Sequence, residues 1–269
     1  MATIPRWSMS QITTLNQDFG RDIELYRRHG VKCVGLSLAK LNAFGADRGE
    51  RLLRDAGMAV SCVTTAGPLD YSGTTIGRQR NEDAAEVLRL GARLGADCVM
   101  LMTGADATRS WEENAQALRP LIEDLVRVAE RERIRIAIEP THALRVDTSF
   151  IHGFGDALDF VDSIDSPWLG VVMEVNNAWI EPRLYRNIAE RLHRIFLVQV
   201  SDWKIGTLTT PQRVVIGDGN IPLKRILKAL ADAGYAGWYD IELIGPAIEA
   251  EGYASVVPRS IRAFEALWA

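Results

Sequence analysis

The sequence predicts an α/β fold that closes into a single (β/α)₈ TIM barrel. Short β-branched, apolar runs alternate with longer segments of helical period, which is typical of β-α repeats around a parallel sheet. Eight such repeats fit within 269 residues, a usual length for this barrel. The first predicted strand is not followed by a GxGxxG fingerprint, which disfavours a dinucleotide-binding sheet. With no linker or low-complexity stretch, we expect residues 1–269 to form one domain.

Each expected strand is a short apolar run bounded by turn-forming or charged residues. The eight strands are Ile4–Met9, Val31–Leu36, Ala59–Thr64, Asp97–Met102, Ile134–Glu139, Leu169–Glu174, Ile195–Ser201 and Gly237–Glu242. Apolar residues at helical spacing predict the helices Asp18–His29, Gly45–Ala56, Asn81–Leu94, Ser110–Glu132, Asp156–Ile164, Arg183–His193, Pro222–Ala233 and Ser255–Trp268. Two longer loops, Thr65–Arg80 and Trp203–Ile221, are expected at the carboxyl ends of the strands, where barrel enzymes have their sites.

Composition excludes several classes of protein. The 31 basic and 35 acidic residues give a net charge of −4 without a basic stripe, so we expect no nucleic-acid partner. Apolar runs fall far short of the roughly 18 residues of a membrane span, and the N-terminus lacks a signal-peptide pattern. We therefore expect a cytoplasmic protein without a membrane partner. Cys33, Cys62 and Cys98 lie in apolar runs without CxxC spacing and are expected as buried thiols.

Three predicted strands end in a carboxylate: Glu139, Glu174 and Glu242. A carboxylate at the end of a buried strand costs several kcal/mol unless it is compensated. Three of them at one barrel mouth would repel each other, which would force protonation or require a strong cation. Gln199 supplies an amide oxygen at the corresponding depth of the seventh strand. These four residues are the candidate ligands of a divalent metal ion, with Mn²⁺ favoured and Mg²⁺ or Co²⁺ as alternatives.

The chain resembles the xylose-isomerase-like sugar isomerase/epimerase family over nearly its whole length. The resemblance is carried by Ile138-Glu139-Pro140, Ile180-Glu181, Arg213-Val-Val-Ile-Gly-Asp-Gly219 and Gly237-Trp-Tyr-Asp-Ile-Glu242. It implies a barrel that holds a divalent metal through Glu, Asp, His and Glu, with the two glutamates acting as an acid–base pair. Glu139 and Glu242 match those glutamates, whereas Glu174 and Gln199 stand where Asp and His are expected.

The resemblance also suggests substrate-binding positions. Arg213 matches the family's loop arginine, Asn177 stands where a histidine is common, and Arg145 stands where a glutamate is common. The metal platform is therefore expected to be kept, with altered contacts to the sugar.

His142 lies three residues after Glu139, and an imidazole there is suited to proton transfer or to a backbone hydrogen bond. Asp202 is expected either to support a ligand or to cap the following turn. Strand parity places Asp240 inside the barrel, and we expect it to pair there with Arg135. Three tryptophans are expected near strand ends, to stack on a sugar or to pack in the core: Trp7, Trp111 and Trp179.

These features predict a metal-dependent sugar or polyol isomerase or epimerase, with Glu139, Glu242 and His142 as catalytic residues. The alternative is a metal-dependent lyase on the same barrel, a sugar-acid dehydratase or a C-glycoside-cleaving subunit, with His142 as the base. A non-enzymatic binding barrel is a minor alternative. The expected partners are a small sugar or polyol and further copies of the chain, or a different subunit in the case of the lyase.

Overall fold

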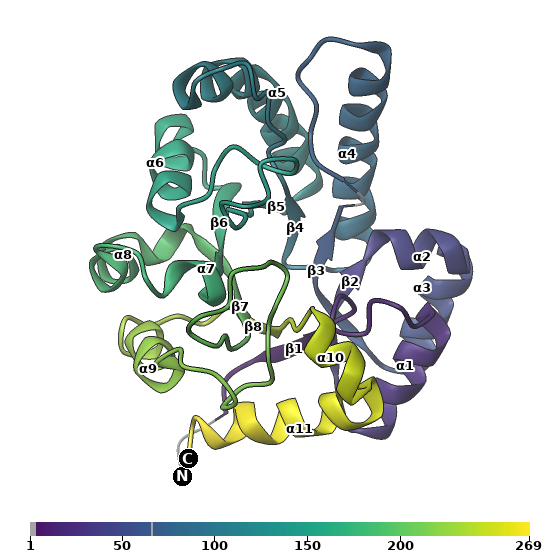
Figure 1. Ribbon diagram of the computed structural model, residues 1–269. Coiled ribbons are helices and arrows are strands. Elements are labelled where there is room, and N and C mark those ends of the chain that lie inside the picture. Colours follow the sequence, from purple (N-terminus) through teal and green to yellow (C-terminus); the bar gives the residue numbers. More distant parts are fainter. Residues whose placement is uncertain (1–3, 66) are drawn as a thin grey trace.

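The computed structural model describes residues 4–65 and 67–269, which contain eight parallel strands closed into a barrel (Figure 1). The strands are β1 (Trp7–Ser10), β2 (Cys33–Ser37), β3 (Ala59–Thr64), β4 (Cys98–Leu101), β5 (Arg135–Ile138), β6 (Leu169–Glu174), β7 (Ile195–Val200) and β8 (Trp238–Ile241). Each strand pairs with its neighbours in chain order, and β8 closes the barrel against β1. The predicted (β/α)₈ barrel is confirmed.

Helices surround the barrel (Figure 1). The longer helices are α1 (Phe19–Arg28), α3 (Ala46–Asp55), α4 (Thr75–Arg93), α5 (Trp111–Glu132), α6 (Phe154–Ile164), α8 (Leu184–Arg191), α9 (Leu223–Asp232) and α11 (Tyr253–Ala266). The short ones are α2 (Leu38–Phe44), α7 (Val175–Ala178), α10 (Pro246–Glu251) and the 3₁₀ turn η1 (Leu192–Arg194). Within the described ranges, every helix is too short or too polar to cross a membrane.

The start of α4 corrects one prediction. The helix begins at Thr75, not at Asn81, so the end of the expected loop Thr65–Arg80 is helical. Thr74 caps it, because its hydroxyl accepts a hydrogen bond from the Gly77 amide at 3.0 Å. The apolar spacing that located the helix is weak in this first polar stretch.

Alternation along the strands separates two cores. On β4, Val99 and Leu101 belong to the main core shared with the helices, whereas Cys98 and Met100 belong to a smaller second core. Successive side chains of a barrel strand point outward and inward in turn, so the smaller core fills the barrel interior. The three cysteines are free and buried, as predicted.

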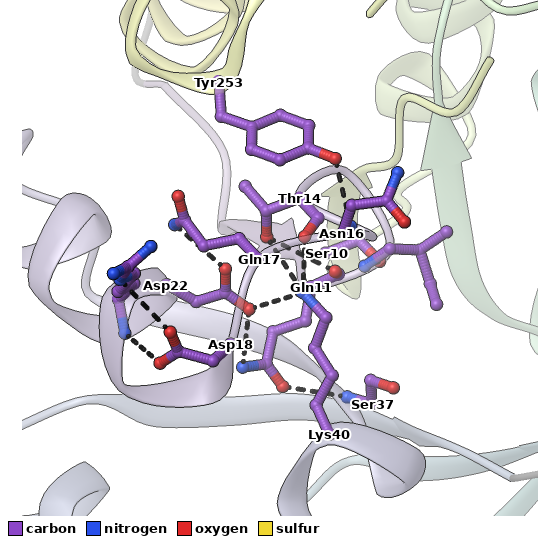
Figure 2. A network of polar contacts seen from close by, with 12 residues as sticks. Ser10, Gln11, Thr14, Asn16, Gln17, Asp18, Asp22, Ser37, Lys40 and Tyr253 are labelled. Carbon is purple, nitrogen blue, oxygen red and sulfur yellow. Dashed lines mark hydrogen bonds and ion pairs between the residues drawn. The ribbon is translucent and has the colours of Figure 1, made fainter. Parts of the chain in front are cut away.

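A buried polar network ties together the segments that follow β1 and β2 (Figure 2). Lys40 of α2 donates to the Asp22 carboxylate of α1 at 2.7 Å and to the Thr14 carbonyl at 2.6 Å. Gln11 donates to Asp22 at 3.2 Å and accepts from the Ser37 amide at 3.0 Å. The network therefore fixes the β1–α1 loop, which follows the last residue of β1 at the barrel mouth.

Replacing Lys40 with methionine is expected to lower the free energy of unfolding by about 3–5 kcal/mol, because Asp22 stays buried without its charged partner. The Asp22 side chain is fully buried and that of Lys40 is 10% exposed. Adding Asp22→Asn to the same chain should recover much of this loss. Urea unfolding of both variants measures the difference, and a double variant as unstable as Lys40→Met alone would contradict the pairing.

The pH dependence of stability gives an independent check on Asp22. Burial raises its pKa from 3.8 to about 6, against the opposing charge of Lys40. Between about pH 4 and 6 the folded protein therefore binds more protons than the unfolded chain, and this group makes the protein less stable as the pH rises. The single variant Asp22→Asn should gain stability relative to wild type as the pH is raised through this window.

Candidate active site

The structure places the four predicted metal ligands at one end of the barrel. Glu139 and Glu242 directly follow β5 and β8, Glu174 is the last residue of β6, and Gln199 lies next to the end of β7. All strands are parallel, so their carboxyl ends form a single face. Glu174 is paired in register with Gln199, so these two side chains point the same way.

Contacts centre on Glu242 and Arg213. The Gln199 amide nitrogen donates to Glu242 Oε2 at 2.5 Å, and the Ser10 hydroxyl donates to the same oxygen at 3.3 Å. Arg213 Nη1 donates to Glu242 Oε1, and its Nη2 lies 3.4 Å from Glu174 Oε2. Glu174 and Glu242 are only 1% and 5% exposed. Arg213 is thus the counter-charge that joins two buried carboxylates.

The loop after β7 holds Arg213 in place. Asp202 and Val214 exchange backbone hydrogen bonds of 3.2 and 2.9 Å. The Asp202 carboxylate accepts hydrogen bonds from the amides of Gly217 at 3.0 Å and Gly219 at 3.1 Å. Of the two roles left open for Asp202, the structure therefore shows the capping of a turn. This turn fixes the residue that follows Arg213.

Gly245 allows the same loop to approach the end of β8. The Arg213 amide donates to the Ile244 carbonyl at 2.9 Å. At Gly245, which has φ +141°, an added Cβ would lie 2.8 Å from the Pro211 carbonyl oxygen. A side chain at this position would therefore displace the strand end from the segment that carries Arg213.

The acidic cluster, defined here as Glu139, Glu174 and Glu242, has altered protonation equilibria. Burial, together with the charges of Glu242 and Glu174, raises the pKa of Glu139 to about 8, against the opposing charge of Arg213. Burial also raises the pKa of Glu174, again against Arg213. Burial disfavours the charged Arg213, but Glu174 and Glu242 outweigh this effect and raise its pKa.

The donor set fits a hard divalent cation. Glu174 Oε2, which lies 3.4 Å from Arg213 Nη2, and Gln199 Oε1 are buried and accept no hydrogen bond from the described residues. Three carboxylates against one guanidinium would leave two net negative charges when all are ionised, which a divalent ion would neutralise. Oxygen ligands suit Mn²⁺ and Mg²⁺. The side chains are not arranged as a coordination cage, since within residues 4–65 and 67–269 no group of three His, Cys, Asp or Glu is placed to hold a metal ion.

The other predicted site residues, His142, Arg145 and Asn177, lie on the segments that follow β5 and β6. His142 is partly buried, and its Nδ1 accepts a hydrogen bond from the Leu144 amide at 3.2 Å. Burial and the neighbouring His152 lower the pKa of His142. Asn177 donates to the Pro140 carbonyl at 3.3 Å, which joins the loops after β5 and β6.

Arg145 is paired with Asp147 through two contacts of 2.9 Å on the exposed part of the loop after β5. Its guanidinium is therefore already paired with the Asp147 carboxylate of the same loop. Whether it binds substrate stays a prediction.

The expected pair between Asp240 and Arg135 is wrong. Arg135 lies 3.5 Å from the Asp97 carboxylate and donates to the Asp97 carbonyl at 3.1 Å. Asp240 is buried and accepts a hydrogen bond from the Ser8 hydroxyl at 2.5 Å. Burial raises the pKa of Asp240 to about 8. Strand parity predicted that both side chains point inward, but Arg135 pairs with Asp97 and not with Asp240.

The tryptophans have different surroundings. Trp7 begins β1, at the opposite end of the barrel, and packs against Phe264 at 6.3 Å between ring centroids. Trp111 packs against Phe150 at 5.6 Å. The ring centroids of Trp179 and Trp203 lie 6.3 Å apart. The sequence did not single out Trp203, although it follows Asp202 in a loop that was expected near the site. Ser10 was also missed, and only its place at the end of the first strand could have indicated it.

Comparison with known proteins adds a family and several relatives. The family model for the xylose isomerase-like TIM barrel matches residues 23–264. L-ribulose-5-phosphate 3-epimerase UlaE of Escherichia coli O157:H7 (strain EC4115) is 23% identical over 165 residues, which cover 59% of this chain and 55% of that protein. The chain thus spans about half the length of this curated relative.

Solved structures agree with the fold over nearly the whole chain. Protein SMc04130 of Sinorhizobium meliloti 1021 has a TM-score of 0.90 at 22% identity, covering 98% of this chain and 99% of that one. The IolI protein, solved with a bound zinc atom, has a TM-score of 0.86 at 18% identity and covers 97% of each chain. At these identities the likeness establishes the barrel architecture alone.

Proposed function

This chain belongs to the xylose isomerase-like TIM barrel family, and on that premise we propose that it is a divalent-metal-dependent sugar or polyol isomerase or epimerase. The observation that carries the proposal is the acidic cluster, with Gln199 beside it, at the carboxyl ends of β5 to β8. The epimerase activity in the name of UlaE and the zinc atom in the IolI structure support the same class.

Glu139, Glu174, Gln199 and Glu242 would hold the metal ion, with Mn²⁺ favoured over Mg²⁺ or Co²⁺. When bound, the ion would act as a Lewis acid on a carbonyl or hydroxyl oxygen of the substrate. Burial of Glu174, Gln199 and Glu242 among strand ends keeps water away from the charges that hold the ion.

The chain's own residues carry the proton. Glu242 is held by Arg213, Gln199 and Ser10, so its carboxylate has a fixed direction. Glu139 is partly exposed, and its carboxylate makes no hydrogen bond to a described residue. We assign them as an acid–base pair, in which one removes a proton from the carbon beside the carbonyl and the other returns one.

The lyase alternative depends on His142 as a base. A neutral imidazole has one bare nitrogen, and in His142 the Leu144 amide donates to Nδ1. The ring proton then lies on Nε2, so the side chain facing the substrate would donate a hydrogen bond. This contact favours the isomerase over the lyase.

His142→Ala is therefore expected to lower kcat/KM by about tenfold, because one hydrogen bond to the substrate contributes about 1.4 kcal/mol. If His142 were the general base, its removal would lower kcat/KM by about 10²–10⁴-fold instead. Steady-state kinetics with the metal content measured separate the two values. A thousandfold loss with metal still bound would contradict the assignment and favour the lyase.

A substrate screen in D₂O with added Mn²⁺ tests the function, with NMR detection of both C–H exchange and elimination. We expect metal-dependent deuterium incorporation next to a carbonyl, which is lost in Glu139→Gln. Elimination without exchange would favour the lyase. If sugars bind but neither reaction occurs across the panel, the non-enzymatic binding barrel is favoured. We expect homo-oligomers and a cytoplasmic location, as the sequence predicts.

A further inference from the structure

A cavity of about 220 Å³ opens beside the acidic cluster. Its lining comes from the segments that follow β5, β6 and β7: His142, His152, Asn176, Asn177, Trp179 and Trp203 among others. We call it the aromatic cavity. The Asn176 amide donates to Glu174 Oε1 at 3.3 Å, and Asn177 bonds to Pro140, the residue after Glu139. Two lining residues are therefore bonded to Glu174 or to the residue that follows Glu139.

The aromatic cavity has no basic lining residue within the described chain except its two histidines. Its one acidic residue is Glu181, whose carboxylate accepts hydrogen bonds from the amides of Phe154 and of Gly155, the latter at 3.0 Å. These amides form the N-terminus of α6, a position that often binds phosphate. Because Glu181 already occupies it, an anionic ligand would meet a negative charge there.

Two arginines of the candidate site are already paired with carboxylates. Arg145 is paired with Asp147, and Arg213 is held by Glu242 and Glu174. Lys204 follows Trp203 but does not line the cavity. A phosphate group in the aromatic cavity would therefore be desolvated without a guanidinium or ammonium partner, at a cost of several kcal/mol.

The lining suits an uncharged ring. Trp179 and Trp203 both line the cavity, with their rings inclined at 53°, and indole packs well against a ring with an apolar face. The volume corresponds to roughly seven water molecules at ~30 Å³ each, enough for one six-membered ring. Asn176 and Asn177 also line the cavity, and a side-chain amide can both donate a hydrogen bond to a hydroxyl group and accept one from it.

We propose that the aromatic cavity binds an uncharged ring joined to the reacting sugar or polyol, and that it excludes a phosphate group. The ring is either a second sugar or an aromatic group, since both have an apolar face that stacks on indole. This inference rests on the proposed function, because the acidic cluster must be where the attached sugar reacts. It separates this chain from UlaE, whose name specifies a phosphorylated sugar.

Calorimetric titration of the full-length protein with four probes tests the proposal: glucose, cellobiose, phenyl β-D-glucopyranoside and glucose 6-phosphate. We expect cellobiose or the phenyl glucoside to bind at least tenfold more tightly than glucose, and glucose 6-phosphate to bind no better than glucose. The better of the two ring ligands identifies the source of the ring. Equal binding of all four, no binding of either ring ligand, or tightest binding of glucose 6-phosphate would overturn the proposal.

Variants locate the effect. Trp179→Ala and Trp203→Leu should each lose about tenfold in affinity for the ring ligand, the contribution of one aromatic contact. Trp168→Ala is the matched control, because Trp168 precedes β6 at the other end of the barrel. Preferential ring binding that both variants retain would overturn the assignment. Ring binding without metal-dependent deuterium exchange would refute the proposed function but not the cavity assignment. Deuterium exchange without preferential ring binding would refute the cavity assignment but not the proposed function.

Discussion

Replacing Glu139 with glutamine is expected to lower kcat by about 10²–10⁴-fold, the contribution of a positioned acid or base. The amide keeps the shape of the side chain and an oxygen for the metal, but it cannot exchange a proton. Glu139 directly follows β5 and is the most exposed member of the acidic cluster. Steady-state kinetics at saturating Mn²⁺ measure the effect.

The control for this variant is Glu190→Gln, which removes a carboxylate that pairs with Arg186 on the surface of α8. It should leave kcat unchanged. If Glu139→Gln binds the metal and keeps more than a tenth of the wild-type rate, Glu139 is not part of the acid–base pair.

Replacing Arg213 with methionine is expected to destabilise the metal-free protein by about 3–5 kcal/mol, because two buried carboxylates lose their counter-charge. Arg213 contacts both Glu174 and Glu242, and its side chain is only 11% exposed. Added Mn²⁺ should stabilise this variant more than it stabilises wild type, since the ion then supplies the missing positive charge.

Urea unfolding in EDTA and in Mn²⁺ measures both effects, with Arg213→Lys as the variant that keeps the charge. Arg213→Lys should lie between the other two proteins in stability. A methionine variant as stable as wild type in EDTA would show that the two carboxylates do not depend on the arginine.

The regular features of the barrel could be predicted from the sequence. The strands Ala59–Thr64 and Leu169–Glu174 have the predicted bounds, because a buried parallel strand is a short, nearly continuous apolar run. The short helices α2, α7 and α10 were not predicted, since segments of four to seven residues have too little periodicity. These helices are stabilised by tertiary contacts, such as those of Lys40 in α2 with Asp22 and Thr14.

Contacts within the candidate site were harder to predict than positions. Strand ends located Glu139, Glu174, Gln199 and Glu242, because parallel strands deliver their carboxyl ends to one face. Strand parity predicts the direction in which a side chain points, but the partner of a buried charge depends on distances between side chains, which parity does not predict. Arg213 was therefore predicted as a substrate contact, while the structure shows it bonded to Glu242.

Isothermal titration of Mn²⁺ into the metal-free protein tests the central claim, that the acidic cluster and Gln199 form one divalent-metal site. We predict one ion per chain and at least a tenfold loss of affinity in Glu174→Gln and in Glu242→Gln. Asp232→Asn, which removes a surface carboxylate paired with Lys228, should bind as wild type does. No binding to wild type, or wild-type affinity in both cluster variants, would contradict the account.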